Sequence, residues 1–232
     1  AQEGASVALI DGDFYGPSIP TLLGDGQVIP DHEGKLIPPS KYGIKYISIG
    51  YFLSHPDDPI IWRGPMFNKA LEQMFFDVNW GDVDYCVVDM PPGTGDAQLS
   101  LCQMVKISGT VLVTTPQELA LADVRKAANM LKKVDSPLLG VVENMAGFTA
   151  PDGSVCNIFG SGGGKKLAES LSVPLLCSIP IEQSIREGGD AASPVVCSNS
   201  EIAAIFRGLA KRIGAALEQK ESLKRPSLKI LD

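Results

Sequence analysis

Residues 84–96, with the sequence DYCVVDMPPGTGD, decide the predicted fold because a buried strand leads directly into an acid and a glycine-rich loop. Consecutive apolar residues before Asp89 are typical of a parallel strand that is covered on both faces. The loop then contains Gly93, Thr94 and Gly95. Ligands of open α/β sheets bind at the carboxyl ends of strands, where an acid can hold Mg²⁺ on a nucleotide through water. Gly93 gives a backbone that can approach a terminal phosphate.

The rest of the chain alternates short apolar strands with segments of helical periodicity. Besides Tyr85–Asp89, the predicted strands are Ser6–Ile10, Ile44–Ile49, Thr110–Thr114, Leu138–Val142 and Leu175–Ile179. The predicted helices are Pro65–Phe76, Ala97–Val105, Gln117–Lys133, Lys165–Leu171 and Glu201–Glu218. This alternation predicts an α/β fold, a doubly wound and mainly parallel sheet flanked by helices. We expect one domain over residues 1–219, followed by a polar tail, residues 220–232.

Composition excludes several classes of protein. The 232 residues are 44% hydrophobic and 20% charged, which predicts a globular chain with a core. The net charge of −7 argues against a protein whose main task is to grip nucleic acid, and no apolar run is long enough to cross a membrane. The cysteines are odd in number and never form C-x-x-C, so we expect reduced core thiols in a cytoplasmic protein. They are Cys86, Cys102, Cys156, Cys177 and Cys197.

Two further polar motifs follow predicted strands. Asp11 and Asp13 leave the first strand, and Asn144 follows the strand that ends near Val142. A carboxamide can pair with a nucleotide base as donor and acceptor at once. Each motif alone is also explained by an ordinary helix cap or turn. Their shared position at strand ends favours a single ligand site.

A family resemblance becomes specific at the level of strings. The chain contains, in order, DGDFYGPSIP, WRGP, DYCVVDMPPGTGDAQLS, TTPQELALADVRKA, GVVENM, IFGSGGG and IPIEQSIREGGDAASPVV. From residue 1 to about residue 216 it resembles the Mrp family (also called ApbC), deviant P-loop ATPases that carry iron–sulfur clusters. The resemblance implies ATP and Mg²⁺ as ligands, a homodimer that faces itself around ATP, and apoproteins or scaffold proteins of iron–sulfur assembly as partners. It implies no nucleic acid or membrane partner.

The resemblance also assigns roles to residues. Asp13 matches the aspartate that positions the attacking water, and Asp11 matches its more structural neighbour. Asp89 matches the acid that holds Mg²⁺. The stretch from Gly93 to Asp96, which includes Thr94 and Gly95, matches the loop that senses the terminal phosphate. The remaining assignments are Asn144 for contact with adenine, and Pro180 and Ile181 for the loop against the base.

The phosphate-binding loop of the family, of the form GKGGVGKS, should stand about thirty residues before Asp11. The chain begins after that point, so we expect an N-terminally truncated protein that lacks the first strand, the P-loop and the first helix. As given, it should be nearly inactive as an ATPase. Gly160–Lys166 is glycine-rich, but it is one residue too short for a P-loop and lacks the Ser or Thr that binds Mg²⁺. A helix-entry turn is the better interpretation.

The cluster ligands of the family are also missing. Many members have C-P-x-C just after ENM, and two subunits together hold a [4Fe–4S] cluster with those thiolates. Here the cysteine positions fall on Ala150 and Gly153. Cys156 is near, but one thiol per subunit is too few, and an ordinary surface cysteine is the simpler interpretation.

Other features receive ordinary interpretations. His32 and His55 are expected to be solvated. Arg63 either positions a partner or belongs to a helix entry. The C-terminal amphipathic helix is expected to pack on the protein rather than on a membrane. Two other functions stay open, namely a partition or positioning ATPase of the ParA/MinD kind and a non-enzymatic regulator on the same fold.

Overall fold

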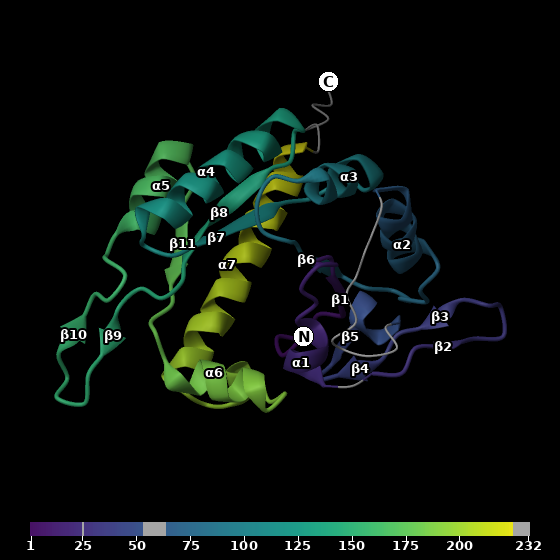
Figure 1. Ribbon diagram of the computed structural model, residues 1–232, viewed down its shortest axis with the longest axis horizontal. Coiled ribbons are helices and arrows are strands. Elements are labelled where there is room, and N and C mark those ends of the chain that lie inside the picture. Colours follow the sequence, from purple (N-terminus) through teal and green to yellow (C-terminus); the bar gives the residue numbers. More distant parts are fainter. Residues whose placement is uncertain (25, 53–63, 225–232) are drawn as a thin grey trace, which may run out of the picture. The chain divides into compact units, whose positions relative to one another are not determined.

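The computed structural model describes residues 1–24, 26–52 and 64–224, and it divides into two compact units (Figure 1). Unit 1 comprises residues 1–105 and 184–194, and unit 2 comprises residues 106–183 and 195–232. All six predicted strands form and pair in parallel, which confirms the predicted α/β class. Three of the predicted strands lie in each of two sheets, because Tyr85–Asp89 and Thr110–Thr114 are each an edge strand and do not pair with each other. The predicted domain boundaries stay a prediction.

The sheet of unit 1 has the order β4-β5-β1-β6. Its strands are β1 (Val7–Asp11), β4 (Ser40–Lys41), β5 (Ile44–Ser48) and β6 (Tyr85–Asp89). β1 lies between β5 and β6 and is parallel to both, with Asp11 paired to Ser48 on one side and to Asp89 on the other. The last residues of three parallel strands therefore lie side by side.

Among the described residues, four helices, a 3₁₀ turn and a hairpin accompany this sheet. The helices are α1 (Ile19–Leu23), α2 (Gly64–Phe76), α3 (Asp96–Met104) and α6 (Gln183–Asp190), with a 3₁₀ turn at Ile49–Phe52 and a hairpin of β2 (Ile29–Pro30) and β3 (Leu36–Ile37). Ile19 and Leu23 of α1 form a core cluster with Tyr46. The ring of Phe14, just beyond β1, lies 4.6 Å from that of Phe67 in α2.

The sheet of unit 2 has the order β11-β8-β7 and is entirely parallel. Its strands are β7 (Thr110–Thr114), β8 (Leu138–Glu143) and β11 (Leu175–Ser178). Every residue of the central strand β8 is buried, as consecutive apolar positions predict. Figure 1 shows α4 (Glu118–Lys133) and α5 (Gly163–Leu171) on one side of this sheet and α7 (Glu201–Lys224) on the other. A hairpin of β9 (Phe148–Thr149) and β10 (Val155–Cys156) follows β8.

The structure corrects two details of the sequence predictions. Helix α7 runs to Lys224, so residues 220–224 of the predicted tail are helical, because this stretch is rich in good helix formers. The cysteines are free as predicted, but none lies in the core. Cys86 is exposed because β6 is an edge strand of its sheet.

Some residues covered by the sequence predictions lie outside the described residues, namely Arg63, His55 and residues 225–232 of the tail. None of the described helices is long and apolar enough to span a membrane.

Candidate functional site

The carboxyl edge of the unit 1 sheet is organised around Asp11, which is fully buried. Its Oδ2 accepts hydrogen bonds from the hydroxyl of Ser48 at 2.8 Å and from the amide of Ile19 at 3.2 Å. Its Oδ1 accepts the amide of Asp13 at 3.2 Å. Burial raises the pKa of Asp11, and these hydrogen bonds oppose the shift. Asp11 therefore fixes the loop that carries Asp13 and the start of α1.

Asp13 and Asp89 are the two carboxylates that this edge leaves accessible. Asp13 lies in the loop after β1, where its Oδ1 accepts the amides of Tyr15 at 3.2 Å and Gly16 at 3.1 Å. Asp89 ends β6 and is exposed. Nearby protein atoms still desolvate its carboxylate, and this desolvation, together with repulsion from Asp13, raises its pKa against a lowering hydrogen bond from Ser18. The pair is thus a site of concentrated negative charge.

Gly12 lets β1 approach Asp89 closely. Its amide donates to the carbonyl oxygen of Asp89 at 2.7 Å. A Cβ at this position would lie 2.8 Å from that oxygen and 3.2 Å from a methyl carbon of Val88. Only glycine therefore permits this spacing between the two acidic segments.

The loop after Asp89 leads into α3. Gly93 has a φ of +93°, a left-handed conformation that favours glycine, and Gly95 is the N-cap of α3. Gly93 and its neighbours Thr94 and Gly95 are exposed. The amide nitrogen of Gln98 donates to the carbonyl oxygens of Pro91 and Gly93, at 2.7 and 3.2 Å. The loop is thus held from the first turn of the helix that follows it.

The predicted base-binding residues lie together at the carboxyl edge of the unit 2 sheet. Asn144 follows β8; its amide donates to Thr114 at 2.7 Å, and its Oδ1 accepts the amide of Met145 at 2.9 Å. The amide of Ile181, which follows Pro180 after β11, donates to Gly147 at 2.7 Å. The loops after β8 and β11 are therefore joined by backbone hydrogen bonds. The structure groups Asn144, Pro180 and Ile181 in unit 2, and the acidic residues in unit 1.

Glu143 explains why the glycine-rich stretch at 160–166 is not a phosphate loop. The carboxylate of Glu143 is buried at the end of β8, where its Oε1 accepts the amide of Gly164 at 2.7 Å in the first turn of α5. A phosphate loop presents such amides to its ligand, whereas this one already has a partner within the protein. Gly162, in a left-handed conformation, is the N-cap of α5. The predicted helix-entry turn is thus confirmed.

No cluster of metal ligands accompanies the hairpin of β9 and β10. Cys156 is exposed on β10, and Ala150 and Gly153 occupy the hairpin tip, where the amide of Gly153 donates to Ala150 at 2.9 Å. Among the described residues, no group of three or more His, Cys, Asp or Glu side chains is placed to hold a metal ion.

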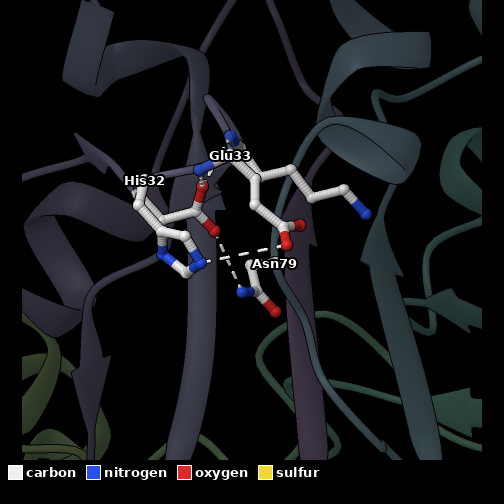
Figure 2. A network of polar contacts seen from close by, with 5 residues as sticks. His32, Glu33 and Asn79 are labelled. Atoms are coloured by element: carbon white, nitrogen blue, oxygen red, sulfur yellow. Dashed lines mark hydrogen bonds and ion pairs between the residues drawn. The ribbon is translucent and has the colours of Figure 1, made fainter.

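Figure 2 shows the surroundings of His32, which lie in the hairpin of β2 and β3 in unit 1. His32 contacts Glu33 at 3.8 Å, and both side chains are largely exposed. The turn is organised by Asp31, whose carboxylate accepts the amides of Glu33 and Lys35 and the side chain of Asn79. These contacts close a turn at the surface, as expected for a solvated histidine.

Sequence reasoning missed four residues that shape the two edges. Ser48 and Gln98 act in unit 1, and Glu143 and Ser178 act in unit 2, where the hydroxyl of Ser178 donates to Glu143 at 3.4 Å. Serines carry no strong sequence signal. Ser48 could nevertheless have been identified as a candidate from its position near the end of a predicted parallel strand, because the ends of such strands meet at one edge of the sheet.

Comparisons with known proteins agree with this geometry. A family model described as ParA, NUBPL iron-transfer P-loop NTPase, matches residues 1–214. An iron-sulfur cluster carrier protein of Aquifex aeolicus is 46% identical over 225 residues, which are 95% of this chain and 62% of that protein. The chain spans 60 to 63% of the length of four such carriers.

Solved structures match as well. A nucleotide-binding protein of Archaeoglobus fulgidus, in complex with ADP, is 36% identical, with a TM-score of 0.71 over 83% of this chain and 76% of that chain. The cell division ATPase MinD of Pyrococcus furiosus is 22% identical, with a TM-score of 0.64 over 92% of this chain and 87% of that chain, and so shows a shared fold alone. Because the family model covers most of the chain, the chain belongs to the ParA/NUBPL family of iron-transfer P-loop NTPases.

Proposed function

We propose that the full-length protein binds and hydrolyses ATP and acts in the assembly of iron–sulfur clusters or their transfer to apoproteins. The observation that carries this proposal is the alignment of Ser48, Asp11 and Asp89 at the ends of three adjacent parallel strands. This edge holds Asp13 in a loop fixed by the buried Asp11. Membership of a family of iron-transfer NTPases supports the same reading.

Asp13 positions the attacking water, and Asp89 holds Mg²⁺ through water. The residues fit this cation because carboxylate oxygens are ligands that Mg²⁺ prefers, and Asp89 and Asp13 leave the same edge of one sheet. Desolvation and then repulsion from Asp13 raise the pKa of Asp89, and a divalent cation would relieve that repulsion. When bound, Mg²⁺ would neutralise charge on the ATP phosphates. Asp11 holds the loop that carries Asp13 and does not contact the substrate, since its side chain is buried.

The other contacts to ATP are assigned as follows. Gly93, Thr94 and Gly95 face the terminal phosphate, and Asn144, Pro180 and Ile181 contact the base. The oxygen of Asn144 already accepts the amide of Met145, so its side-chain nitrogen would meet the base. The glycine-rich stretch 160–166 is a poor substitute for a phosphate loop, because Glu143 already occupies the amide of Gly164. The 232-residue chain alone should therefore hydrolyse ATP hardly at all.

The cluster is cargo, and its acceptors are iron–sulfur apoproteins or scaffold proteins in the cytoplasm. We propose a homodimer in which ATP controls the geometry of the two subunits. A [4Fe–4S] cluster would require thiolates from both subunits. Cys156 is exposed and available, whereas Ala150 and Gly153 at the hairpin tip cannot bind iron.

The test is anaerobic reconstitution of the full-length protein with iron and sulfide, followed by transfer to an apo-ferredoxin with and without Mg-ATP. We expect a bound cluster and transfer that depends on ATP, and a loss of both in Cys156→Ala would identify Cys156 as one ligand among others. Cys197→Ala is the matched control, because Cys197 is also an exposed thiol of unit 2. Failure to bind or transfer iron, with ATP hydrolysis intact, would contradict the cargo part of the proposal and leave an ATPase.

A further inference from the structure

Gln98 is an unusual buried polar residue next to the acidic edge of unit 1. It lies in the first turn of α3 and is only 7% exposed. Its Nε2 lies within hydrogen-bonding distance of three successive carbonyl oxygens, those of Pro91, Pro92 and Gly93, at 2.7, 3.4 and 3.2 Å. One side chain therefore contacts the backbone of three successive residues in the loop that follows Asp89.

These three acceptors also fix the orientation of the carboxamide. Turning the group over would place Oε1 against three carbonyl oxygens, with no proton between them. Oε1 consequently points the other way, and it is the one fully buried side-chain oxygen or nitrogen without a partner among the described residues. A Cβ at Gly95 would lie 3.7 Å from it, so Oε1 faces the second half of the same loop.

A buried acceptor without a partner costs free energy, so its retention indicates a partner in another state of the loop. Gly95, the N-cap of α3, lies beside Oε1. Gly93 supplies a left-handed conformation within the same loop, and a Cβ there would meet nothing within 4 Å. The loop thus has room to change its conformation beside Gln98.

We propose that Gln98 is a positioning residue, which holds the Pro91–Gly93 segment through its amide nitrogen and offers its amide oxygen to a backbone N–H of the Thr94–Gly95 segment when ATP is bound. This proposal rests on the proposed ATPase function. Gln98 touches neither phosphate nor water in this scheme. It controls turnover by setting where the loop stands relative to Asp89.

The test uses Gln98→Met in the full-length protein, which keeps the approximate length of the side chain and removes both hydrogen-bonding groups. We expect kcat for Mg-ATP to fall about tenfold while KM stays within about threefold, as for a contact that matters after substrate has bound. Hydrogen exchange at the amides of Gly93, Thr94 and Gly95 should become faster, and the protection that a non-hydrolysable ATP analogue adds should disappear. The matched control is Gln103→Met, on the exposed side of the same helix, which should behave as wild type.

Gln98→Glu provides a second variant of nearly the same shape, without the donor. It should resemble Gln98→Met, and normal turnover and exchange in Gln98→Glu would overturn the proposal. Equal kcat and unchanged exchange in Gln98→Met would also overturn it, as would a loss of thermal stability with kcat and KM changed together. If wild type does not hydrolyse ATP at all, the proposed function fails, and the exchange measurements still decide whether Gln98 holds the loop.

Discussion

Asp11 in unit 1 and Glu143 in unit 2 are two buried carboxylates held in nearly the same way. Each ends a strand that pairs in parallel with both of its neighbours, and each accepts a hydroxyl from the serine paired with it on a neighbouring strand, Ser48 or Ser178. Each also accepts a backbone amide where a helix begins, that of Ile19 or Gly164. The same device therefore anchors loops at both carboxyl edges.

The two edges differ in what lies beyond the anchor. In unit 1 the anchor stands beside two accessible carboxylates, Asp13 and Asp89, and the charge of Asp13 helps to raise the pKa of Asp89. In unit 2 the anchor is followed by the carboxamide of Asn144 and by loops joined through their backbones. This difference is why we propose the first edge for a cation and reactive phosphate, and the second for a neutral base.

The largest effect on stability is expected at the unit 2 anchor. Glu143→Ala leaves the Gly164 amide without its partner and opens a space at a buried strand end, so the free energy of unfolding should fall by about 2–3 kcal/mol. Urea denaturation of the full-length protein measures this change. Glu169→Ala, on the exposed side of α5, serves as the control and should stay close to wild type. If Glu143→Ala were as stable as wild type, the contacts of Glu143 would not contribute to the stability of the fold.

The next effect should appear at the unit 1 edge and concern Mg²⁺ rather than folding. Asp89→Asn removes a carboxylate proposed to hold the cation through water, so the Mg²⁺ concentration for half-maximal ATP hydrolysis should rise roughly 10- to 100-fold. A Mg²⁺ titration of the rate at saturating ATP checks this. Asp84→Asn, one strand length away at the amino end of β6, should leave the titration curve in place. A curve unchanged in Asp89→Asn would remove Asp89 from the metal site.

The close approach of Gly12 to Asp89 should give a smaller effect. Gly12→Ala places a methyl group 2.8 Å from the carbonyl oxygen of Asp89, which should lower the free energy of unfolding by about 1–2 kcal/mol. Gly208→Ala is the control in helix α7, where a Cβ meets nothing within 4 Å, and it should stabilise by up to about 1 kcal/mol. Thermal unfolding of both variants measures the two changes. If Gly12→Ala is as stable as Gly208→Ala, the close approach at Gly12 does not require glycine.

The smallest effect expected is a pH dependence of opposite sign at two aspartates. The pKa of Asp89 is raised above its ordinary value of 3.8, so its carboxyl group favours the folded state below that pH, and this contribution is lost as pH rises through the folded pKa. Asp89→Asn should therefore gain stability over wild type between acid and neutral pH.

Asp31 provides the opposite case. Desolvation raises the pKa of Asp31, but the hydrogen bonds from Asn79 and from the amides of Glu33 and Lys35 together outweigh it, so the pKa is lowered. Its contribution is present above 3.8 and is lost as pH falls through the folded pKa, so Asp31→Asn should lose stability relative to wild type at neutral pH. Thermal unfolding from pH 3 to pH 7 tests both signs, and equal signs would contradict the assigned causes.

The strands could be predicted from the sequence, whereas the side-chain contacts at their carboxyl ends could not. Tyr85–Asp89 and Thr110–Thr114 have the observed bounds, because apolar runs that end at a polar residue define buried parallel strands. The short helices α1 and α6 were not predicted, since five and eight residues carry too little periodicity. The adjacency of Asp11 and Asp89 followed from parallel pairing, whereas the roles of Glu143 and Gln98 depend on side-chain contacts that no local pattern encodes.

Single-turnover hydrolysis of Mg-ATP by full-length Asp13→Asn shows whether the acidic edge of unit 1 hydrolyses ATP, as we propose. We expect a rate roughly 100-fold below wild type, with ATP affinity within a few fold, because the residue proposed to position the attacking water is lost. Asp31→Asn, at a partly exposed acid in the turn between β2 and β3, should keep the wild-type rate. An unchanged rate in Asp13→Asn would contradict the claim.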